Sequence, residues 1–326
     1  MNPAAGDDAR WLAAAASLAA RARPRSRPNP AVGAIVVRHG RVIGHGWTQP
    51  GGRPHAEAGA LAMAGAAAQG ATLYVTLEPC AHASARGPAC ADLVVAAGLA
   101  RVVAGCEDPD PRTAGQGLAR ILDNGITAEL QHSPEVAVSL SGYLTQRVKN
   151  RPYVTLKLAT SLDGCIALAS GESQWITGSA ARAHTHAMRA RADAILVGGG
   201  TLRADAPRLD VRLPGLEARS PQRWVLTRGA APDGWRALPS PEAIAAMTDT
   251  QHLFVEGGAQ TAAAFVRSGL VDRLLLYRAP TAFGGGIAAF RNPGPDGVPA
   301  GWRLADRRRL GSDTLEVYTP GRSEGA

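Results

Sequence analysis

The chain has 326 residues, a formal net charge of +8 and a pI of about 9.9. Hydrophobic residues make up 45% and charged residues 19% of it, a balance typical of soluble globular proteins that excludes a disordered chain. Its apolar runs fall short of the roughly eighteen residues that a membrane-spanning helix needs. Because the chain exceeds one ordinary hydrophobic core, we expect two domains.

The distribution of charge narrows the class of partner. All but two of the 35 basic residues are arginines, scattered along the chain apart from short clusters at 21–27 and 307–309. Aromatic residues make up only 5%, so the basic stripe with stacking aromatics that is typical of nucleic-acid binding is not expected. We expect a phosphorylated small molecule as the partner, no nucleic acid and no membrane.

The chain start and the cysteines bear on the compartment. Asp7 and Asp8 stand where a secretory signal would carry positive charge, so a cytoplasmic protein is expected. In that compartment the cysteines are more suited to metal binding or burial than to disulfides. Cys106 and Cys165 lie in apolar, strand-like segments and are predicted to be core residues.

Hydrophobic spacing and turn residues predict alternating strands and helices in the first half. Helices are expected at about 7–21, 55–69, 90–97, 115–124 and 134–149, and strands at 32–38, 41–46, 72–77, 101–106 and 126–130. This order predicts a layered α/β domain. The Asn150-Arg151-Pro152 segment is the predicted boundary, which gives domains of residues 1–149 and 150–326.

The second half predicts another α/β domain. Strands are expected at 153–160, 194–197, 223–227, 253–256, 273–277 and 314–318, and helices at 179–191 and 260–268. The segment 207–241 is predicted to be rich in loops. No internal repeat is found.

The strongest chemical signal is His55-Ala56-Glu57, followed by Glu78-Pro79-Cys80 and then Cys90. One imidazole and two thiolates, from His55, Cys80 and Cys90, would leave the fourth position of a zinc ion to water, whose pKa zinc lowers toward neutrality. Glu57 is not expected to be a ligand. It is suited to carry a proton from that water to a leaving amine, as in zinc deaminases.

Two other interpretations of this group remain open. Nine residues separate Cys80 from Cys90, whereas two separate the cysteines of the usual deaminase signature. His55 could therefore be an ordinary residue at the start of a helix, and the two cysteines could be buried core residues. A structural zinc site would need four protein ligands, and His82 could be the fourth.

The first half of the chain resembles the deaminase domain of the bifunctional riboflavin-biosynthesis deaminase–reductases. The matching segments are Pro28-Asn29-Pro30-Ala31-Val32-Gly33, Pro54 to Glu57, Tyr74 to Cys80, and Asp108-Pro109-Asp110-Pro111 with Ala114-Gly115. The resemblance implies a cytidine-deaminase-like α/β/α fold and a wide cysteine spacing. It also implies a diaminopyrimidinone ribosylamino phosphate as the substrate, in contact with Asn29 and Asp108.

The chain departs from the family pattern at three places near this site. The 83–89 loop differs from the usual sequence and is one residue longer, Thr48 stands where the family often has His, and Asp110 stands where Asn is usual. These departures put the substrate contacts in question, and Ser84 or Arg86 could take over a phosphate contact.

Residues of the second half give a weaker signal by themselves. Gly198-Gly199-Gly200-Thr201 and Glu256-Gly257-Gly258 each follow a predicted strand, where backbone N–H groups can approach a phosphate. Neither is Gly-x-Gly-x-x-Gly, and a tight turn explains either alone; together they suggest a dinucleotide crevice at the edge of a sheet. Lys157, in the middle of an apolar strand, needs an anionic partner.

The second half also resembles the reductase domain of the same family, which is dihydrofolate-reductase-like and uses NADPH. The matching segments are Thr155 to Ala159, Ser161 to Gly164, Gly171 to Thr177, Asp205 to Leu209 and Val255 to Gly258. The resemblance places Lys157 and Asp205 at the reacting region. It implies that NADPH contacts Ala159, Trp175, Thr201, Asp205, Gly258, Ala259, Gln260, Thr261, Ala262, Ala263 and Ala264. It implies that substrate contacts Ser173, Arg189, Leu209, Arg212 and Glu256.

The prediction is therefore a riboflavin-biosynthesis enzyme with Zn²⁺ and NADPH as cofactors, which deaminates the pyrimidine and then reduces its ribosyl group to ribityl. Three alternatives stay open: a nucleoside or tRNA deaminase with an unrelated second domain, a zinc-stabilised scaffold without turnover, and an active reductase with an impaired deaminase. A homo-oligomer is possible, and the sequence does not fix its size.

Overall fold

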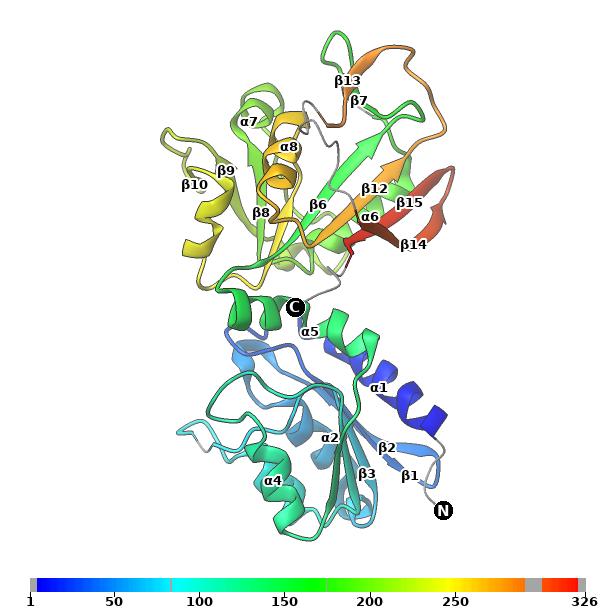
Figure 1. Cartoon of the computed structure of the whole chain (residues 1–326), viewed down its shortest axis with the longest axis vertical. Coiled ribbons are helices and arrows are strands. Elements are labelled where there is room, and N and C mark those ends of the chain that lie inside the picture. Colours follow the sequence, from blue (N-terminus) through cyan, green and yellow to red (C-terminus); the bar gives the residue numbers. More distant parts are fainter. Residues whose placement is uncertain (1–4, 83, 174, 291–300, 322–326) are drawn as a thin grey trace. The chain divides into compact units, whose positions relative to one another are not determined.

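The computed structural model describes residues 5–82, 84–173, 175–290 and 301–321. The chain divides into two compact units, Met1–Asn150 and Arg151–Ala326, and each is treated by itself (Figure 1). Among the described residues, no helix has both the length and the apolar character needed to cross a bilayer.

The first unit alternates strands and helices. Its strands are β1 (Gly33–Arg38), β2 (Arg41–Trp47), β3 (Thr72–Val75), β4 (Arg101–Ala104) and β5 (Thr127–Leu130). Its α-helices are α1 (Ala5–Ala19), α2 (Ala56–Ala64), α3 (Cys90–Ala96), α4 (Gln116–Asp123) and α5 (Pro134–Lys149). The strands form one sheet in the order β2-β1-β3-β4-β5, antiparallel on both sides of β1 and parallel from β3 to β5.

Glycines let helices lie directly on both faces of this sheet. A Cβ on Gly33 would come within 2.0 Å of the Ala15 carbonyl oxygen in α1, and one on Gly46 within 2.3 Å of the Ala56 carbonyl oxygen in α2. Since Gly46 pairs with Ala34, the neighbour of Gly33, the two glycines face opposite sides of the sheet. The unit is therefore the α/β/α sandwich that the sequence predicts, and α2 is held against the sheet at the end that carries His55.

The second unit contains a larger sheet. Its strands are β6 (Tyr153–Thr160), β8 (Ala194–Gly198), β9 (Gln222–Leu226), β10 (Arg236–Leu238), β11 (His252–Val255), β12 (Arg273–Arg278), β14 (Trp302–Leu310) and β15 (Asp313–Pro320), in the order β10-β9-β8-β11-β6-β12-β15-β14. The pairs from β10 to β12 are parallel, and β15 and β14 add an antiparallel edge. A separate pair joins β7 (Cys165–Leu168) to β13 (Gly286–Ala288).

Helices cover both faces of this second sheet. Val154 and Leu156 of β6 pack in the core that includes Phe265 of α8 (Ala259–Arg267), whereas Ile195 of β8 packs with Ala181 of α6 (Ser179–Arg189) on the other face. A short helix, α7 (Gly199–Asp205), begins where β8 ends. Lys157 alternates with Leu156 along β6 and so points to the face that carries α6.

The structure corrects several details of the predicted elements. The helix expected at 55–69 is interrupted at Gly65, whose φ of 53° ends α2 before a 3-10 turn at Gly65–Ala68. The strands β7, β10, β13 and β14 and the helix α7 were not predicted, because they are short or lack an alternating apolar pattern. Cys165 is buried, but Cys106 is only half-buried, with its thiol donating to the Glu107 carbonyl oxygen.

Candidate functional sites

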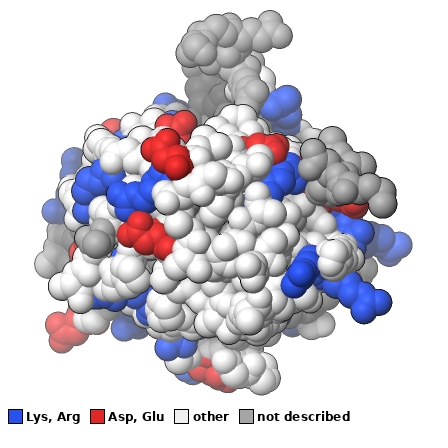
Figure 2. Space-filling model, turned by 90° about the horizontal axis from the view of Figure 1, so that it is seen from below, with Lys and Arg blue, Asp and Glu red and all other residues white. Residues whose placement is uncertain are grey.

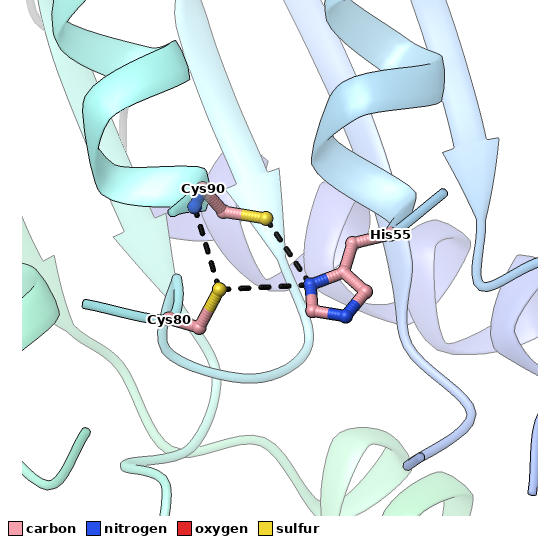
Figure 3. Close-up of side chains that lie close together, drawn as sticks. All are labelled: His55, Cys80 and Cys90. Atoms are coloured by element: carbon pink, nitrogen blue, oxygen red, sulfur yellow. Dashed lines mark hydrogen bonds between the residues drawn. The ribbon is translucent and has the colours of Figure 1, made fainter. Parts of the chain in front are cut away.

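The predicted zinc ligands converge at one end of the first unit (Figure 3). His55 is the N-cap of α2, Cys90 is the first residue of α3, and Cys80 lies in the loop after β3. Nδ1 of His55 lies 3.3 Å from Sγ of Cys90 and 3.6 Å from Sγ of Cys80. The three ligand atoms all lie within 4.8 Å of one another, which one tetrahedral metal ion can satisfy.

The local environment favours a thiolate at Cys80, whereas the hydrogen bond with Cys80 and then burial raise the pKa of Cys90. Sγ of Cys80 accepts a hydrogen bond from the Cys90 backbone N–H at 3.4 Å, at the start of α3. Hydrogen bonds from Cys90 and then His55, working against burial, lower the pKa of Cys80 to about 4. A thiolate is the form in which cysteine binds metals.

Glu57 lies in the first turn of α2 and lines a cavity together with His55 and Cys80. It is only 3% exposed, and burial raises the pKa of its carboxyl group. A raised pKa makes it easier for a carboxylate to take up a proton, as a proton shuttle must.

His82, the other candidate for a zinc ligand, is engaged elsewhere. Its Nδ1 lies 3.3 Å from Oγ1 of Thr113, and within the described part of the chain the metal-binding group consists of His55, Cys80 and Cys90 alone. Three protein ligands leave a coordination position for water, the arrangement of catalytic rather than structural zinc.

Glu78 connects the loop that carries Cys80, here called the zinc loop, to the loop that carries the predicted substrate residue Asp108. Its Oε2 accepts from the backbone N–H groups of Asp108 at 3.3 Å and Gly115 at 3.0 Å, and its Oε1 from those of Gly117 at 2.9 Å and Leu118 at 3.1 Å. This carboxylate therefore holds the 108–115 loop and the first turn of α4 next to Cys80. The sequence analysis did not assign it a role.

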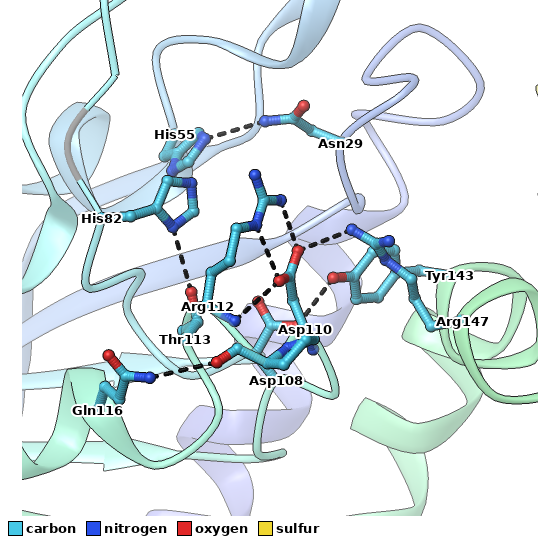
Figure 4. Close-up of polar contacts among 11 residues, drawn as sticks. Asn29, His55, His82, Asp108, Asp110, Arg112, Thr113, Gln116, Tyr143 and Arg147 are labelled. Atoms are coloured by element: carbon cyan, nitrogen blue, oxygen red, sulfur yellow. Dashed lines mark hydrogen bonds and ion pairs between the residues drawn. The ribbon is translucent and has the colours of Figure 1, made fainter.

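The substrate residues predicted for the first unit lie on the same cavity of about 390 Å³ (Figure 4). Nδ2 of Asn29 lies 3.0 Å from Nε2 of His55 and donates to the Gly52 carbonyl oxygen. Asp108 is buried, which raises the pKa of its carboxyl group, and accepts a 2.8 Å hydrogen bond from the hydroxyl of Tyr143. Tyr143 lies on α5, far along the chain, and sequence reasoning missed it.

The three departures from the family pattern all line this cavity. Oγ1 of Thr48 accepts from the Val32 N–H at 3.0 Å, and the guanidinium of Arg86 donates to the Gly51 carbonyl oxygen at 3.0 Å. Asp110 is bonded by Arg112 and Arg147, two arginines that the sequence analysis did not single out. Ser84, in the altered loop, is also on the cavity lining.

The second unit has a cavity of about 410 Å³ around a buried charge cluster. Arg189, at the end of α6, donates through Nε and Nη2 to both oxygens of Glu256, at 2.6 and 3.0 Å. Nζ of Lys157 lies 4.0 Å from Oε2 of Glu256, which supplies the anionic partner that the sequence analysis required. Burial lowers the pKa of Lys157, and Arg189 keeps the pKa of Glu256 low although burial alone would raise it.

Most predicted contacts of the second unit lie on this cavity or on a neighbouring one of about 600 Å³. The first is lined by Lys157, Ala159, Ser173, Trp175, Arg189, Thr201, Asp205, Arg212, Glu256 and Gly258. The second is lined by Thr201, Gly258, Ala259, Gln260 and Thr261, together with Arg203 and Arg228, which were not predicted. The cavities lie where β6, β8 and β11 end, the edge at which open α/β sheets bind ligands.

Four of the predicted residues lie away from both cavity linings. Ala262 and Ala263 are 0% and 1% exposed in the core under α8, and Leu209 is 5% exposed and packs with the residues around Tyr277. Ala264 is half-buried on α8. Side-chain contact of these four with a ligand therefore remains a prediction.

Comparison with known proteins matches both units. The model of the cytidine and deoxycytidylate deaminase zinc-binding region matches residues 6–106, and that of the RibD C-terminal domain matches residues 152–240 and 237–315. The riboflavin biosynthesis protein RibD of Escherichia coli (strain K12) is 38% identical, with 85% of this chain and 89% of that protein covered. The chain belongs to the RibD family.

Other members of the RibD family agree in sequence and structure. RibD of Corynebacterium ammoniagenes is 40% identical over 83% of this chain and 85% of its own length. A solved deaminase/reductase from Thermotoga maritima, whose title names a diaminohydroxyphosphoribosylaminopyrimidine deaminase and a 5-amino-6-(5-phosphoribosylamino)uracil reductase, is 31% identical. It superposes with a TM-score of 0.87, with 97% of this chain and 99% of that chain covered. Acinetobacter baumannii RibD, 34% identical, gives 0.84 with the same coverage.

The chain is thus a bifunctional enzyme of riboflavin biosynthesis, with a deaminase domain followed by a reductase domain. Zinc fits the first domain and a nicotinamide cofactor the second. The alternative of an unrelated second domain is excluded, because one family covers both halves of the chain.

Proposed function

We propose that the first unit deaminates 2,5-diamino-6-(ribosylamino)pyrimidin-4-one 5'-phosphate with Zn²⁺, and that the second unit then reduces the ribosyl group to ribityl with NADPH. The observation that carries the deaminase assignment is the three-ligand group next to the buried carboxyl of Glu57. A scaffold without turnover would need neither an open coordination position nor a proton carrier beside it.

The donor atoms present fit zinc. One imidazole nitrogen and two sulfurs lie within 4.8 Å of one another, and this combination of ligand atoms is typical of zinc sites. When bound, zinc lowers the pKa of a water molecule toward neutrality, which supplies the nucleophile at physiological pH.

The side chains around this position would then carry the deamination. As the oxygen of water adds to the ring carbon, Glu57 accepts the proton that water loses, and it passes a proton to the exocyclic amine, which leaves as ammonia. Asn29, fixed between His55 and Gly52, and Asp108, held by Tyr143, are positioned to hydrogen-bond the pyrimidine edge. Residues spread over three elements thus fix the ring relative to the metal ligands.

Features of the second unit support NADPH. The glycines at the ends of β8 and β11 allow the close approach of a backbone to a phosphate, and α8 begins at the same edge. Arg203 and Arg228 line the same cavity as Thr201 and the α8 start, and cationic groups there are what a 2'-phosphate requires. The bound cofactor supplies a hydride.

The charge cluster supplies what the hydride step needs from the protein. Opening of the ribosyl ring during reduction places a proton on the ring oxygen, and Lys157, with its lowered pKa, is able to give one. Glu256 holds Lys157, and Arg189 holds Glu256, so the ammonium position is fixed. Asp205, exposed at the end of α7, lines the same cavity and is the second candidate for proton transfer.

The partner implied is a small molecule. The deaminase cavity of about 390 Å³ is suited in size to a nucleotide-like substrate. On the face in Figure 2, the described Lys and Arg side chains are interspersed with Asp and Glu and separated by uncharged surface. That face gives no basic stripe along which a nucleic acid could bind.

The test is a coupled assay on purified, zinc-loaded full-length protein. We expect ammonia release from the diaminopyrimidinone ribosylamino phosphate, followed by oxidation of NADPH. Glu57→Gln should stop ammonia release while zinc content stays unchanged, and it should leave reduction of the pre-deaminated compound intact. NADPH oxidation only with pre-deaminated substrate would contradict the deaminase assignment and favour the impaired-deaminase alternative.

A further inference from the structure

The Asp110 carboxylate occupies an unusual position for a cavity that must accept a phosphorylated substrate. Its side chain is 8% exposed and lines the deaminase cavity, where a negative charge would repel a phosphate. A phosphate can bind beside this carboxylate only where other residues offset its negative charge.

Two guanidinium groups surround this carboxylate (Figure 4). Nε and Nη2 of Arg112 donate to the two oxygens of Asp110 at 2.9 and 2.6 Å, and Nη2 of Arg147 donates to Oδ2 at 2.7 Å. The Arg112 contacts first, and then Arg147, hold the pKa of Asp110 well below its ordinary value, so the carboxylate is ionised. The three side chains together carry a net charge of +1 on the cavity lining.

The two arginines come from different elements, which makes the arrangement dependent on the tertiary fold. Arg112 belongs to the loop that Glu78 holds, whereas Arg147 lies on α5, with its guanidinium 5.5 Å from the ring of Tyr143. Both side chains remain partly exposed, at 63% and 43%, so they face the open side of the cavity rather than the core.

We propose that Asp110, Arg112 and Arg147 form a specificity element whose net positive charge, rather than any single guanidinium, selects phosphorylated over unphosphorylated pyrimidine substrates. The inference rests on the proposed deaminase function. The other acidic and basic side chains on the cavity, Arg53, Glu57, Glu78, Arg86 and Asp108, are the same in the wild type and in every variant compared.

The proposal predicts an order of selectivity by net charge. Selectivity is the ratio of kcat/KM for the 5'-phosphorylated substrate to kcat/KM for its dephosphorylated form. Arg147→Gln or Arg112→Gln lowers the net charge of the three side chains to zero, and Asp110→Asn raises it to +2. Either arginine variant combined with Asp110→Asn returns the net charge to +1. Each unit of charge should change the ratio by roughly three- to fivefold at low salt, so the double variants should regain the wild-type ratio.

Ionic strength and a matched pair provide further readouts. Added salt should lower the ratio in the wild type and in both double variants, but hardly in the arginine single variants, because only the former carry net charge. Arg120 and Asp92 form an exposed ion pair at 3.0 Å on the same unit and do not line the cavity. Arg120→Gln, alone and with Asp92→Asn, should leave the ratio unchanged.

Failure of rescue would overturn the proposal: a ratio that stays low in both double variants would mean that the lost guanidiniums bind the phosphate individually. An equal loss of activity on both substrates, with a lower melting temperature, would likewise overturn it in favour of a structural role. If the wild type releases no ammonia from either substrate, the proposed function fails. The inference is then decided by the affinity for ribose 5-phosphate, measured by calorimetry, which must follow the same order of net charge.

Discussion

Replacement of Glu78 by glutamine tests how the zinc loop and the substrate loop are joined. In the protein, each carboxylate oxygen accepts two backbone N–H groups, from Asp108 and Gly115 on one side and from Gly117 and Leu118 on the other. A glutamine has the same shape but presents an NH₂ group to one of these pairs. Two backbone donors then lose their acceptor.

The expected cost follows from these contacts. Each buried donor left without an acceptor costs about 1–3 kcal/mol, and because Gly115 is partly exposed, we expect a total of about 2–4 kcal/mol. For a domain of this size that corresponds to a fall in melting temperature of roughly 5–15 °C. Since the 108–115 loop carries Asp108 and Asp110, KM for deamination should rise as well.

The assay combines calorimetry of the full-length protein with the two activity measurements. The unfolding transition that moves should be the one that zinc stabilises, and NADPH-dependent reduction of the pre-deaminated substrate should stay near the wild-type rate. Asp123→Asn, an exposed carboxylate on α4, is the matched control and should change neither quantity. A Glu78→Gln protein that melts within about 1 °C of the wild type would refute the account of Glu78 as the tie between the loops.

Four further predictions address the metal, the two cations of the charge cluster and the sheet packing. Removal of zinc with a chelator should abolish ammonia release, measured with a glutamate dehydrogenase assay, and restoration of zinc should recover it; release that persists in metal-free protein would contradict the site. Burial lowers the pKa of Lys157, so the reduction rate should fall as pH rises through a value below the ordinary 10.5, while Lys157→Arg should move that fall to higher pH; an unchanged pH profile would remove Lys157 from proton transfer. Arg189→Ala should destabilise the second unit by about 3–5 kcal/mol in urea unfolding because it leaves Glu256 buried without its main partner, and Arg189→Ala with Glu256→Ala should be less unstable than the single variant. Gly46→Ala should cost at least about 1–3 kcal/mol, since its Cβ would lie 2.3 Å from the Ala56 carbonyl oxygen, whereas Gly59→Ala, whose Cβ would meet only the Gly46 Cα at 3.6 Å, should not destabilise the protein.

The sequence by itself determined the elements that have a strong pattern and the residues whose chemistry is rare. His55, Glu57, Cys80 and Cys90 were found because imidazole and thiols at these positions have few other uses, and the structure brings the three ligands within 4.8 Å. Lys157 was found because an ammonium in an apolar strand requires a partner. In both cases the residue type carried the information.

Only the tertiary structure decided which polar residues share a cavity. Glu256 meets Lys157 because β11 and β6 are parallel neighbours with Val255 opposite Leu156, a register that depends on strand order rather than on local sequence. Tyr143 and Arg147 reach Asp108 and Asp110 only because α5 packs against the rest of the first unit.

The same reason explains where sequence reasoning was incomplete. The sequence could not tell which side chains of the predicted 258–264 cofactor segment face a cavity: Ala259, Gln260 and Thr261 line one, whereas Ala262 and Ala263 are buried. Glu78 gave no signal because its partners are backbone N–H groups, which every sequence offers and only the folded loops bring to one carboxylate. Residue chemistry predicted the zinc site, the family resemblance predicted the reaction, and long-range packing decided how the side chains at the two cavities are held.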